Sequence, residues 1–283
     1  MTLLRCVCSA NADGIGLTAL ARESGMSKAT VHRMMLALVA EGMVEQDAHS
    51  RHYYLGLECH ILGVAASLRH GLHTMAAPLV SRLARECGDT AFLTVPRDVF
   101  AICVLREDGD YPLKTHALMP GDRHPIGVGA GSLAILAAMH DTEVEACLQA
   151  NAALIASRYA NYSLPSLQAQ IQQTRQRGYA LNEGLVIPGS WGMGIAITNA
   201  QKQVLGALSI AAPESRMQAD RQPMLLALLQ QAAHQLLNKW TSSSFDTAAR
   251  DVRPTPLGTH PKKRLPSATT PKADIPSLPR STT

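Results

Sequence analysis

One segment decides the fold of the N-terminal part of this chain: Leu17-Thr-Ala-Leu-Ala21-Arg-Glu-Ser-Gly25-Met-Ser27-Lys-Ala-Thr-Val31-His-Arg33-Met-Met-Leu36-Ala-Leu38. Its spacing predicts a helix-turn-helix, in which two helices are joined by a short turn and the second can lie in the major groove of DNA. Ala21 is small where the helices would cross, and Val31 would lock the second helix onto the first. Gly25 suits a turn that requires a positive φ.

The second helix of this motif is predicted to have a buried side and an open side. Ser27 is a natural N-cap, because its hydroxyl can accept a hydrogen bond from a free backbone N–H. The buried stripe is predicted to consist of Val31, Met34, Met35 and Leu38. The candidate DNA contacts on or near the open side are Ser27, Lys28, Ala29, Thr30, His32 and Arg33, together with Thr18 at the start of the preceding helix.

The open side carries residue types that bind DNA in two different ways. Arg33 can donate two hydrogen bonds to a guanine edge, and Thr30 can contact a thymine methyl or a phosphate. Lys28 and the Ser27 hydroxyl are better placed for phosphates, which position a protein without specifying sequence. The alternative is that these are solvated polar residues on an exposed helix face.

The flanking sequence extends the motif to a winged helix. A helix is predicted over residues 3–10, and short strands over 43–46 and 51–55 surround the polar turn Asp47-Ala-His-Ser50. Arg51, in this wing, is a candidate for a minor-groove or backbone contact.

Composition limits the class of protein. The 283 residues are 46% hydrophobic and 17% charged, which is typical of a globular chain with about two domains. The six cysteines form no C-x-x-C pair, which disfavours a metal site and suits reduced thiols in a cytoplasm. No segment has the roughly 18 uninterrupted apolar residues of a membrane span, and the N-terminus lacks a secretory signal. We therefore expect a cytoplasmic protein without metal, cofactor or membrane partner.

The net charge of +4 is unevenly distributed. Residues 241–283 hold seven Lys or Arg against three Asp, whereas residues 1–58 hold five basic against six acidic residues. Affinity for phosphates must then come from local placement of cations, and two copies are needed for firm binding. Seven of the 16 prolines also lie in 241–283, which predicts a disordered tail that either attracts phosphates or is inert.

The middle of the chain predicts a linker helix followed by an α+β domain with an antiparallel sheet. The linker covers residues 57–72 and carries apolar residues at helical spacing. Further helices are predicted at about 75–87, 132–140, 142–149, 164–177 and 220–240, and strands at 90–95, 99–105, 112–118, 179–187, 192–198 and 204–211. The glycine loop Gly127-Val-Gly129-Ala-Gly131 precedes a helix whose free N–H groups could hold a carboxylate; the alternative is a simple tight turn.

Several motifs occur in an order that resembles the IclR family of bacterial transcription regulators. They are Tyr53-Tyr-Leu-Gly56, Gly121-Asp-Arg-His-Pro-Ile126, Arg177-Gly-Tyr-Ala-Leu-Asn-Glu183, Gly206-Ala-Leu-Ser-Ile210 and Pro213-Glu-Ser-Arg216. The resemblance implies a winged-helix DNA-binding domain at 1–57, a linker helix at 58–73, a GAF-like effector domain at 74–240 and a tail at 241–283. It also implies a homodimer or tetramer whose binding to a double-stranded operator responds to a small organic effector, often a carboxylate.

The resemblance also implies effector-binding positions. Gly129 and Ala130 match the effector-contacting loop, and Asn182 and Glu183 fall in an acidic stretch after residue 181. Ser209 and Ala211 match positions that are often serine, so that Ala211 lacks a hydroxyl. Trp191 is either a wall of the pocket or a core residue.

Two other classes of function remain as alternatives. Gly189-Ser190-Trp191-Gly192 superficially resembles a nucleophile elbow, but Pro188 stands where that motif needs glycine, so catalysis is not expected. The glycine loop at 127–131 does not match a nucleotide-binding fingerprint. A ligand sensor that acts through protein partners, with a vestigial winged helix, is the other alternative. The intact Ser27–Arg33 face favours DNA.

Overall fold

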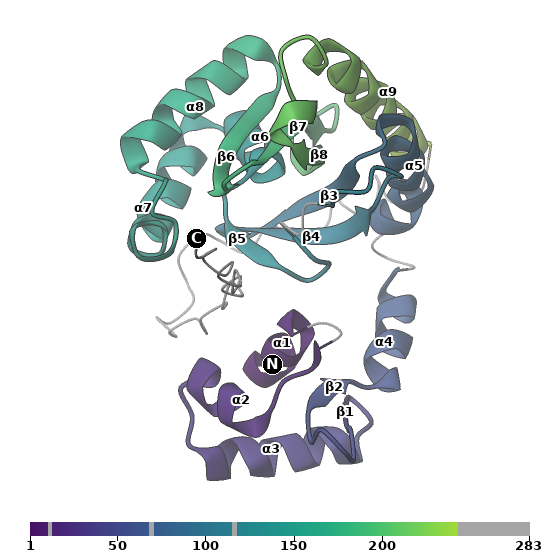
Figure 1. The fold of residues 1–283 in the computed structure, drawn as a ribbon, viewed down its shortest axis with the longest axis vertical. Coiled ribbons are helices and arrows are strands. Elements are labelled where there is room, and N and C mark those ends of the chain that lie inside the picture. The colour runs from purple at the N-terminus through teal and green to yellow at the C-terminus, as the bar shows by residue number, and fades with distance from the viewer. Residues whose placement is uncertain (11–12, 68–70, 115–117, 243–283) are drawn as a thin grey trace, which may run out of the picture. The chain divides into compact units, whose positions relative to one another are not determined.

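A computed structural model describes residues 1–10, 13–67, 71–114 and 118–242. The described residues divide into two compact units, with the boundary between Ile61 and Leu62, inside helix α4 (Leu57–Ser67) (Figure 1). The tail predicted at 241–283 lies outside the described residues from residue 243 onward.

The N-terminal unit is the predicted winged helix-turn-helix. Its elements are α1 (Thr2–Ser9), α2 (Leu17–Ser24), α3 (Lys28–Ala40), β1 (Val44–Gln46) and β2 (Tyr53–Leu55). The two strands pair antiparallel, and Ile15 adds a bridge because its N–H and C=O both bond to Tyr53. The core of this unit is built from all three helices and both strands: Leu3, Leu4, Cys6, Val7, Ile15, Leu20, Val31, Met35, Val44 and Tyr53.

The ends of the helix-turn-helix follow the predicted chemistry. Gly25 ends α2 with φ +69°, a left-handed conformation that glycine adopts without steric cost. Ser27 caps α3, because its Oγ accepts from the Thr30 N–H at 3.2 Å. The predicted burial of Met34 is wrong, since this residue is 41% exposed. Val31 and Met35, four residues apart, already fill the contact with the first two helices, and Met34 lies to one side of them.

The C-terminal unit is built on one six-stranded antiparallel sheet in the order β5-β4-β3-β8-β7-β6. The strands are β3 (Thr90–Arg97), β4 (Phe100–Glu107), β5 (Arg123–Pro125), β6 (Ala180–Ile187), β7 (Ser190–Thr198) and β8 (Val204–Pro213). The helices are α5 (Leu72–Cys87), α6 (Ala130–Ala138), α7 (Asp141–Arg158), α8 (Leu164–Arg177), the 3-10 turn η2 (Glu214–Arg216) and α9 (Gln222–Thr241).

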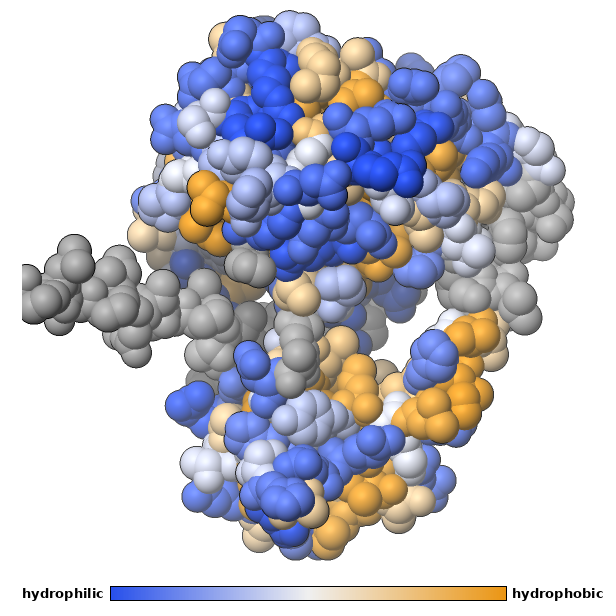
Figure 2. All heavy atoms as spheres, turned by 45° about the vertical axis from the view of Figure 1, so that its right-hand side comes forward, coloured by the Kyte–Doolittle hydropathy of each residue, from blue (hydrophilic) through white to orange (hydrophobic). Residues whose placement is uncertain are grey.

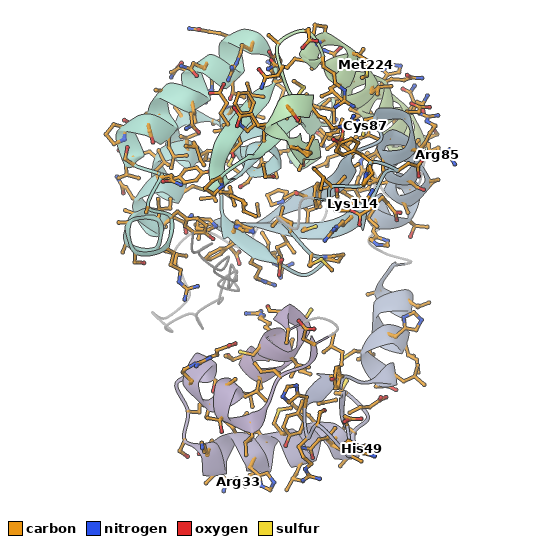
Figure 3. The ribbon with its side chains drawn as sticks, viewed as in Figure 1. Arg33, His49, Arg85, Cys87, Lys114 and Met224 are labelled. Atoms are coloured by element: carbon orange, nitrogen blue, oxygen red, sulfur yellow. The ribbon has the colours of Figure 1, made fainter. Side chains whose placement is uncertain are left out.

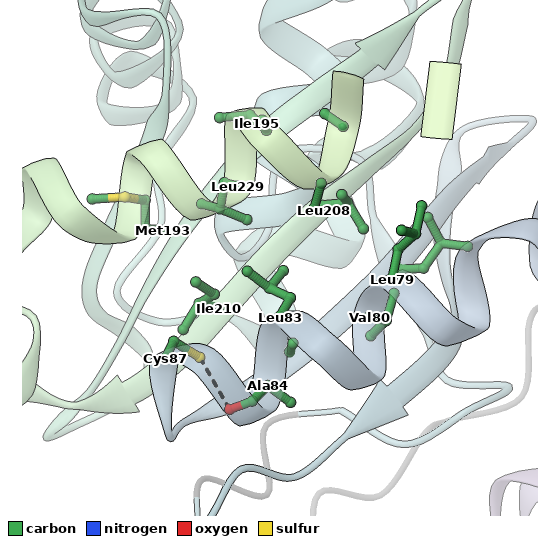
Figure 4. Packing of buried hydrophobic residues seen from close by; sticks show 14 of the residues in the cluster. Leu79, Val80, Leu83, Ala84, Cys87, Met193, Ile195, Leu208, Ile210 and Leu229 are labelled. Atoms are coloured by element: carbon green, nitrogen blue, oxygen red, sulfur yellow. Dashed lines mark hydrogen bonds between the residues drawn. The ribbon is translucent and has the colours of Figure 1, made fainter. Parts of the chain in front are cut away.

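Each face of this sheet has its own core. Helices α5 and α9 pack together on one face, where Leu83, Leu208 and Leu229 belong to one buried cluster (Figure 4). Helices α6, α7 and α8 pack on the other face around Leu133, Ile155 and Leu167. The α+β architecture predicted from the sequence is therefore confirmed.

Several predicted bounds shift by a few residues, among them those of β2, α4 and α5, and two elements differ more. Residues 112–114 and 118 form no strand, residues 115–117 lie outside the described part, and the edge strand beside β4 is β5, where Ile102 pairs with Arg123. The helix predicted at 142–149 extends as α7 to Arg158, because the alanine-rich stretch 150–157 continues it and Ile155 anchors it in the core.

Candidate DNA-reading face and ligand cavity

Both cations of helix α3 lie at the surface of the N-terminal unit. Lys28 and Arg33 are exposed, and α3 contains no acidic residue although residues 1–58 together carry more acidic than basic side chains. Within the described residues, neither cation forms an ion pair or a side-chain hydrogen bond. Both are therefore available to phosphates and base edges.

The polar groups at the start of α3 are partly occupied by each other. The Ser27 and Thr30 hydroxyl oxygens lie 2.9 Å apart, and Ser27 Oγ also accepts from the Thr30 N–H. Thr30 is half-buried, whereas Ala29 and His32 are exposed on α3 and Thr18 is exposed near the start of α2. The structure thus places Thr18, Ser27, Lys28, Ala29, His32 and Arg33 at the surface of one unit.

The wing is held by its own backbone turn. Asp47 Oδ1 accepts from the N–H groups of His49 and Ser50, at 3.1 and 2.6 Å, and from the Ser50 hydroxyl. The hydrogen bonds from Ser50 are the main reason why the pKa of Asp47 lies below its usual value. Arg51 follows with φ +60° and an exposed side chain. In Figure 3, Arg33 and His49 lie along the same edge of this unit, so α3 and the wing can face one duplex.

Two cavities of the C-terminal unit are lined by residues of the sheet and of the start of α6. Their volumes are about 30 and 60 Å³, and they share Leu118, His124, Val128, Gly129 and Ala130. The smaller cavity is also lined by Thr94, Ala101, Cys103, Gly131 and Ser132. The larger one is also lined by Phe92, Asn182, Val186, Ile187, Ser190, Trp191, Gly192 and Ala211. All six strands contribute, so the site exists only once the sheet has formed.

The first turn of α6 opens toward both cavities. Gly129 caps the helix with φ +83°, and by helix geometry the next N–H groups have no partner inside the helix. Tyr162 fixes this start, because its Oη accepts from the Gly129 N–H at 3.0 Å and from Asn182 Nδ2 at 2.6 Å. Burial is the main reason why the pKa of Tyr162 rises to about 12, so the phenol stays protonated.

Two further polar side chains line the cavities. His124 Nδ1 lies 3.1 Å from Tyr159 Oη, and burial lowers the pKa of His124 to about 4, so that the ring is neutral at pH 7. Thr94 is only 3% exposed, and its Oγ1 has no hydrogen-bond partner among the described residues. A buried hydroxyl without a partner is costly, and a bound ligand or water can supply that partner.

Five of the seven predicted effector residues line the larger cavity and two do not. Gly129, Ala130, Asn182, Trp191 and Ala211 belong to its lining. Asn182 Nδ2 donates to Tyr162 Oη, and Asn182 Oδ1 accepts from the Leu185 N–H. Its side chain therefore stabilises the cavity lining. Glu183 is exposed, and Ser209 is buried on β8 outside the lining, where its Oγ lies 3.0 Å from the position a Gly131 Cβ would take.

Sequence reasoning missed Thr94, Cys103 and His124 as lining residues. His124 belongs to the Gly121–Ile126 motif, which was the only signal available for it. Thr94 and Cys103 are paired neighbours on β3 and β4, a relation that depends on strand register and is not visible along the chain.

Within the described ranges, no group of three His, Cys, Asp or Glu side chains is arranged to hold a metal ion. No helix in that part of the chain combines the length and apolar character needed to cross a membrane.

Two family models match this chain. The model of the IclR helix-turn-helix domain matches residues 1–48, and that of the bacterial transcriptional regulator IclR C-terminal domain matches residues 64–238. The HTH-type transcriptional regulator KipR of Bacillus subtilis is 28% identical over 79% of this chain and 88% of its own length. The transcriptional repressor IclR of Escherichia coli is 26% identical over 83% of this chain and 86% of its own length.

Solved structures share the fold. An IclR transcriptional regulator from Alicyclobacillus acidocaldarius superposes with a TM-score of 0.70 at 24% identity, over 83% of this chain and 94% of that chain. An IclR homologue from Microbacterium hydrocarbonoxydans, solved in complex with 4-hydroxybenzoate, gives 0.67 at 18% identity, over 86% of this chain and 98% of that chain.

Members of this family are transcriptional regulators, not enzymes, and combine a DNA-binding helix-turn-helix with an effector-binding domain. The second family model alone spans more than half of the chain. The chain therefore belongs to the IclR family of bacterial transcriptional regulators.

Proposed function

We propose that this protein binds its operator as a homodimer or tetramer, through α3 and the wing, and that a small carboxylate in the C-terminal cavities changes that binding. The observation that carries the proposal is a pair of exposed cations on the acid-free helix α3, Lys28 and Arg33, which form no ion pair with any described residue. In this assignment, Arg33 reads a guanine edge, while Lys28, Ser27 and Thr18 contact phosphates, and Arg51 reaches the minor groove or the backbone from the wing.

A carboxylate is favoured as the effector by three features of the cavity. The open N–H groups at the start of α6 attract anions. Thr94 Oγ1 lacks a partner among the described residues, and the neutral His124 ring can donate one hydrogen bond. The relative from Microbacterium hydrocarbonoxydans, of the same fold, was solved with 4-hydroxybenzoate, which is itself a carboxylate. Phe92 and Trp191 line the larger cavity and suit an effector with an apolar or aromatic body.

A second copy of the chain is favoured by the surface of α4. Among residues 57–66 of α4, whose side chains the structure describes, none is buried, and Leu57, Ile61 and Val64 are all exposed large apolar side chains. Their spacing of four and three residues places them on one side of the helix. Figure 2 shows this hydrophobic surface along the helix that joins the two units. In the proposed domain division of 1–57, 58–73, 74–240 and 241–283, α4 is the linker that carries the effector signal to the DNA-binding domain.

The test is selection of binding sites from random duplexes by the full-length protein, followed by titration of the selected duplex with a panel of small carboxylates. We expect two related half-sites, with centres one helical turn or a multiple of it apart. We also expect at least one carboxylate to change the affinity, and its amide counterpart to have no effect. Recovery of no preferred sequence would contradict the DNA assignment. Identical responses to acid and amide would contradict the carboxylate assignment alone.

A further inference from the structure

Helix α3 presents an apolar side chain, Leu36, beside its reading arginine. Leu36 is 55% exposed, more than the other exposed large hydrophobic residues of this helix, Met34 at 41% and Val39 at 38%. Met34, Leu36 and Val39 together give this helix an exposed apolar surface larger than one isolated side chain, and such surfaces mark interaction sites.

The position of Leu36 follows from the buried side of α3. Val31 and Met35 have no exposed surface, so the direction midway between them marks the core side. With about 100° of rotation per residue, Arg33 points about 180° from that direction. Leu36 lies about 60° from Arg33 around the helix axis, whereas Met34 lies about 100° and Val39 about 120° away. Leu36 therefore shares the face of Arg33, and Met34 and Val39 lie on its flanks.

The other residues of this face are small and apolar. We name the recognition face by its members, which lie within about 60° of Arg33 and are exposed: Ala29, Arg33, Leu36, Ala37 and Ala40. Thr30 lies at its edge, but it is half-buried, and its Oγ1 is already 2.9 Å from Ser27 Oγ. The alanines allow close approach to a rigid surface, and Arg33 is the face's source of side-chain hydrogen bonds.

We propose that Leu36 reads a thymine through its C5-methyl group, next to the guanine that Arg33 contacts; this inference rests on the proposed operator binding. The thymine methyl is the apolar feature of the major-groove edge, and apolar side chains recognise it. Residues 33 and 36 are separated by about 4.5 Å along the helix axis, and successive bases by about 3.4 Å. The thymine therefore lies one or two base pairs from that guanine.

A protein partner for Leu36 is disfavoured by what surrounds it. Arg33 is one turn away on the same face and has no ion-pair partner in the described part of the chain, so a protein covering Leu36 would also have to supply a carboxylate for this cation. DNA satisfies both residues, because the groove offers acceptors and methyl groups side by side. The apolar surface suited to a second copy is on α4, a different element.

The test uses duplexes selected by the full-length protein in which single thymines are replaced by deoxyuridine, which removes only the methyl group. We expect one replacement per half-site to weaken binding by about fourfold, the effect of losing one buried methyl. The sensitive thymine should lie one or two base pairs from a guanine that Arg33 contacts. Replacing that guanine by 7-deazaguanine should weaken DNA binding by the wild type but not by Arg33→Ala.

Substitution of Leu36 completes a double-mutant cycle between this side chain and the thymine methyl. Leu36→Ala should lose about the same factor on the thymine duplex and nothing further on the deoxyuridine duplex, so the two changes are not additive. Met34→Ala and Val39→Ala are the matched controls, being exposed apolar residues off the recognition face, and should respond to deoxyuridine as the wild type does. Circular dichroism checks that the variants remain folded.

The remaining outcomes separate the two levels of the proposal. If Leu36→Ala and the wild type lose affinity equally at every deoxyuridine, Leu36 reads no methyl and the inference is overturned while operator binding stands. A change in the oligomeric mass of Leu36→Ala, measured by sedimentation, would also overturn it by assigning Leu36 to a protein contact. If selection enriches no sequence at all, the proposed operator binding itself fails.

Discussion

In the wing, different residues hold the turn and expose a cation, and Arg51 is the exposed cation. The turn before it is held by the Asp47 carboxylate, and its own carbonyl accepts from Gln46 Nε2 at 3.0 Å, so its side chain is not needed to form the wing. Its φ of +60° is a conformation that costs an L-residue about 1–2 kcal/mol. A cation kept in this conformation at an exposed tip suits a role in contact with DNA.

The first prediction compares two substitutions at this residue. Arg51→Ala and Arg51→Gly should weaken operator binding equally, because both remove the same cation. Arg51→Gly should be the more stable of the two by about 1 kcal/mol, since glycine adopts positive φ freely. Fluorescence anisotropy on the operator and urea unfolding measure the two effects. Wild-type affinity in either variant would contradict the assignment of Arg51 to the interface.

His124 gives the C-terminal unit a dependence on pH. Its pKa of about 4 in the folded protein lies below its ordinary value near 6.5, because burial disfavours the charged ring. Between these two values the unfolded chain binds a proton that the folded chain does not. Stability contributed by the neutral ring is therefore present above pH 6.5 and is lost as the pH falls through this window.

The second prediction measures that loss. From pH 7 to pH 5, the wild type should lose about 2 kcal/mol more unfolding free energy than His124→Gln, in which the residue cannot titrate. Urea unfolding followed at both pH values gives the difference, and the comparison cancels the other titrating groups. Equal losses in both proteins would show that His124 is not held neutral by burial.

At the scale of elements, Gly56 controls how the wing joins the helices. A Cβ on Gly56 would lie 2.1 Å from the Gly42 carbonyl oxygen. Because this oxygen belongs to the backbone, no change of side-chain rotamer can relieve the clash. Tyr53 of the same motif is buried in the core, and Tyr54 donates its hydroxyl hydrogen to the Asp13 carbonyl. The motif Tyr53-Tyr-Leu-Gly56 is thus the joint between β2, the helices and α4.

The third prediction places an alanine at this joint. Gly56→Ala should destabilise the N-terminal unit by about 1–3 kcal/mol, as expected for overpacking against the backbone. Gly63→Ala in α4 is the control: among the described residues, no atom other than the helix's own backbone and its two chain neighbours lies within 4 Å of the added Cβ, and alanine favours helices by about 1 kcal/mol. Thermal unfolding compares the variants. A stable Gly56→Ala would contradict the close approach to Gly42.

The sequence was most informative where a local signal ends an element. Gly25 and Ser27 mark the ends of two helices by their own chemistry, and both are found in those roles. Strand β5 has three residues with one of them buried, so it produces no alternation, and the prediction selected 112–118 instead. Thr94 and His124 line the same cavity because strands that are distant in sequence pair in the sheet. No local sequence pattern encodes that pairing.

At the scale of the whole molecule, the proposed oligomer would use the apolar side of α4 to hold two copies together. Leu57, Ile61 and Val64 lie on one side of that helix, and all three are exposed. Operator recognition by two half-sites requires two α3 helices held at a fixed separation. Association through α4 would supply that constraint.

The fourth prediction is that a charge in this stripe dissociates the oligomer. Ile61→Glu should lower the mass measured by sedimentation toward that of one chain, and weaken operator binding at nanomolar protein concentrations. Leu62→Glu is the control, because Leu62 is similarly exposed but lies about 100° away around the helix. Unchanged mass for Ile61→Glu would show that α4 does not hold the copies together.

The most direct test of the account is the affinity of the wild type, Arg33→Ala and Lys28→Ala for the selected operator and for a random duplex. Arg33→Ala should lose about tenfold to a hundredfold on the operator and little on the random duplex, since it removes a contact to bases. Lys28→Ala should weaken both duplexes by similar factors, since phosphates occur in every sequence. If the two variants lose the same factor on both duplexes, α3 does not read the operator through Arg33.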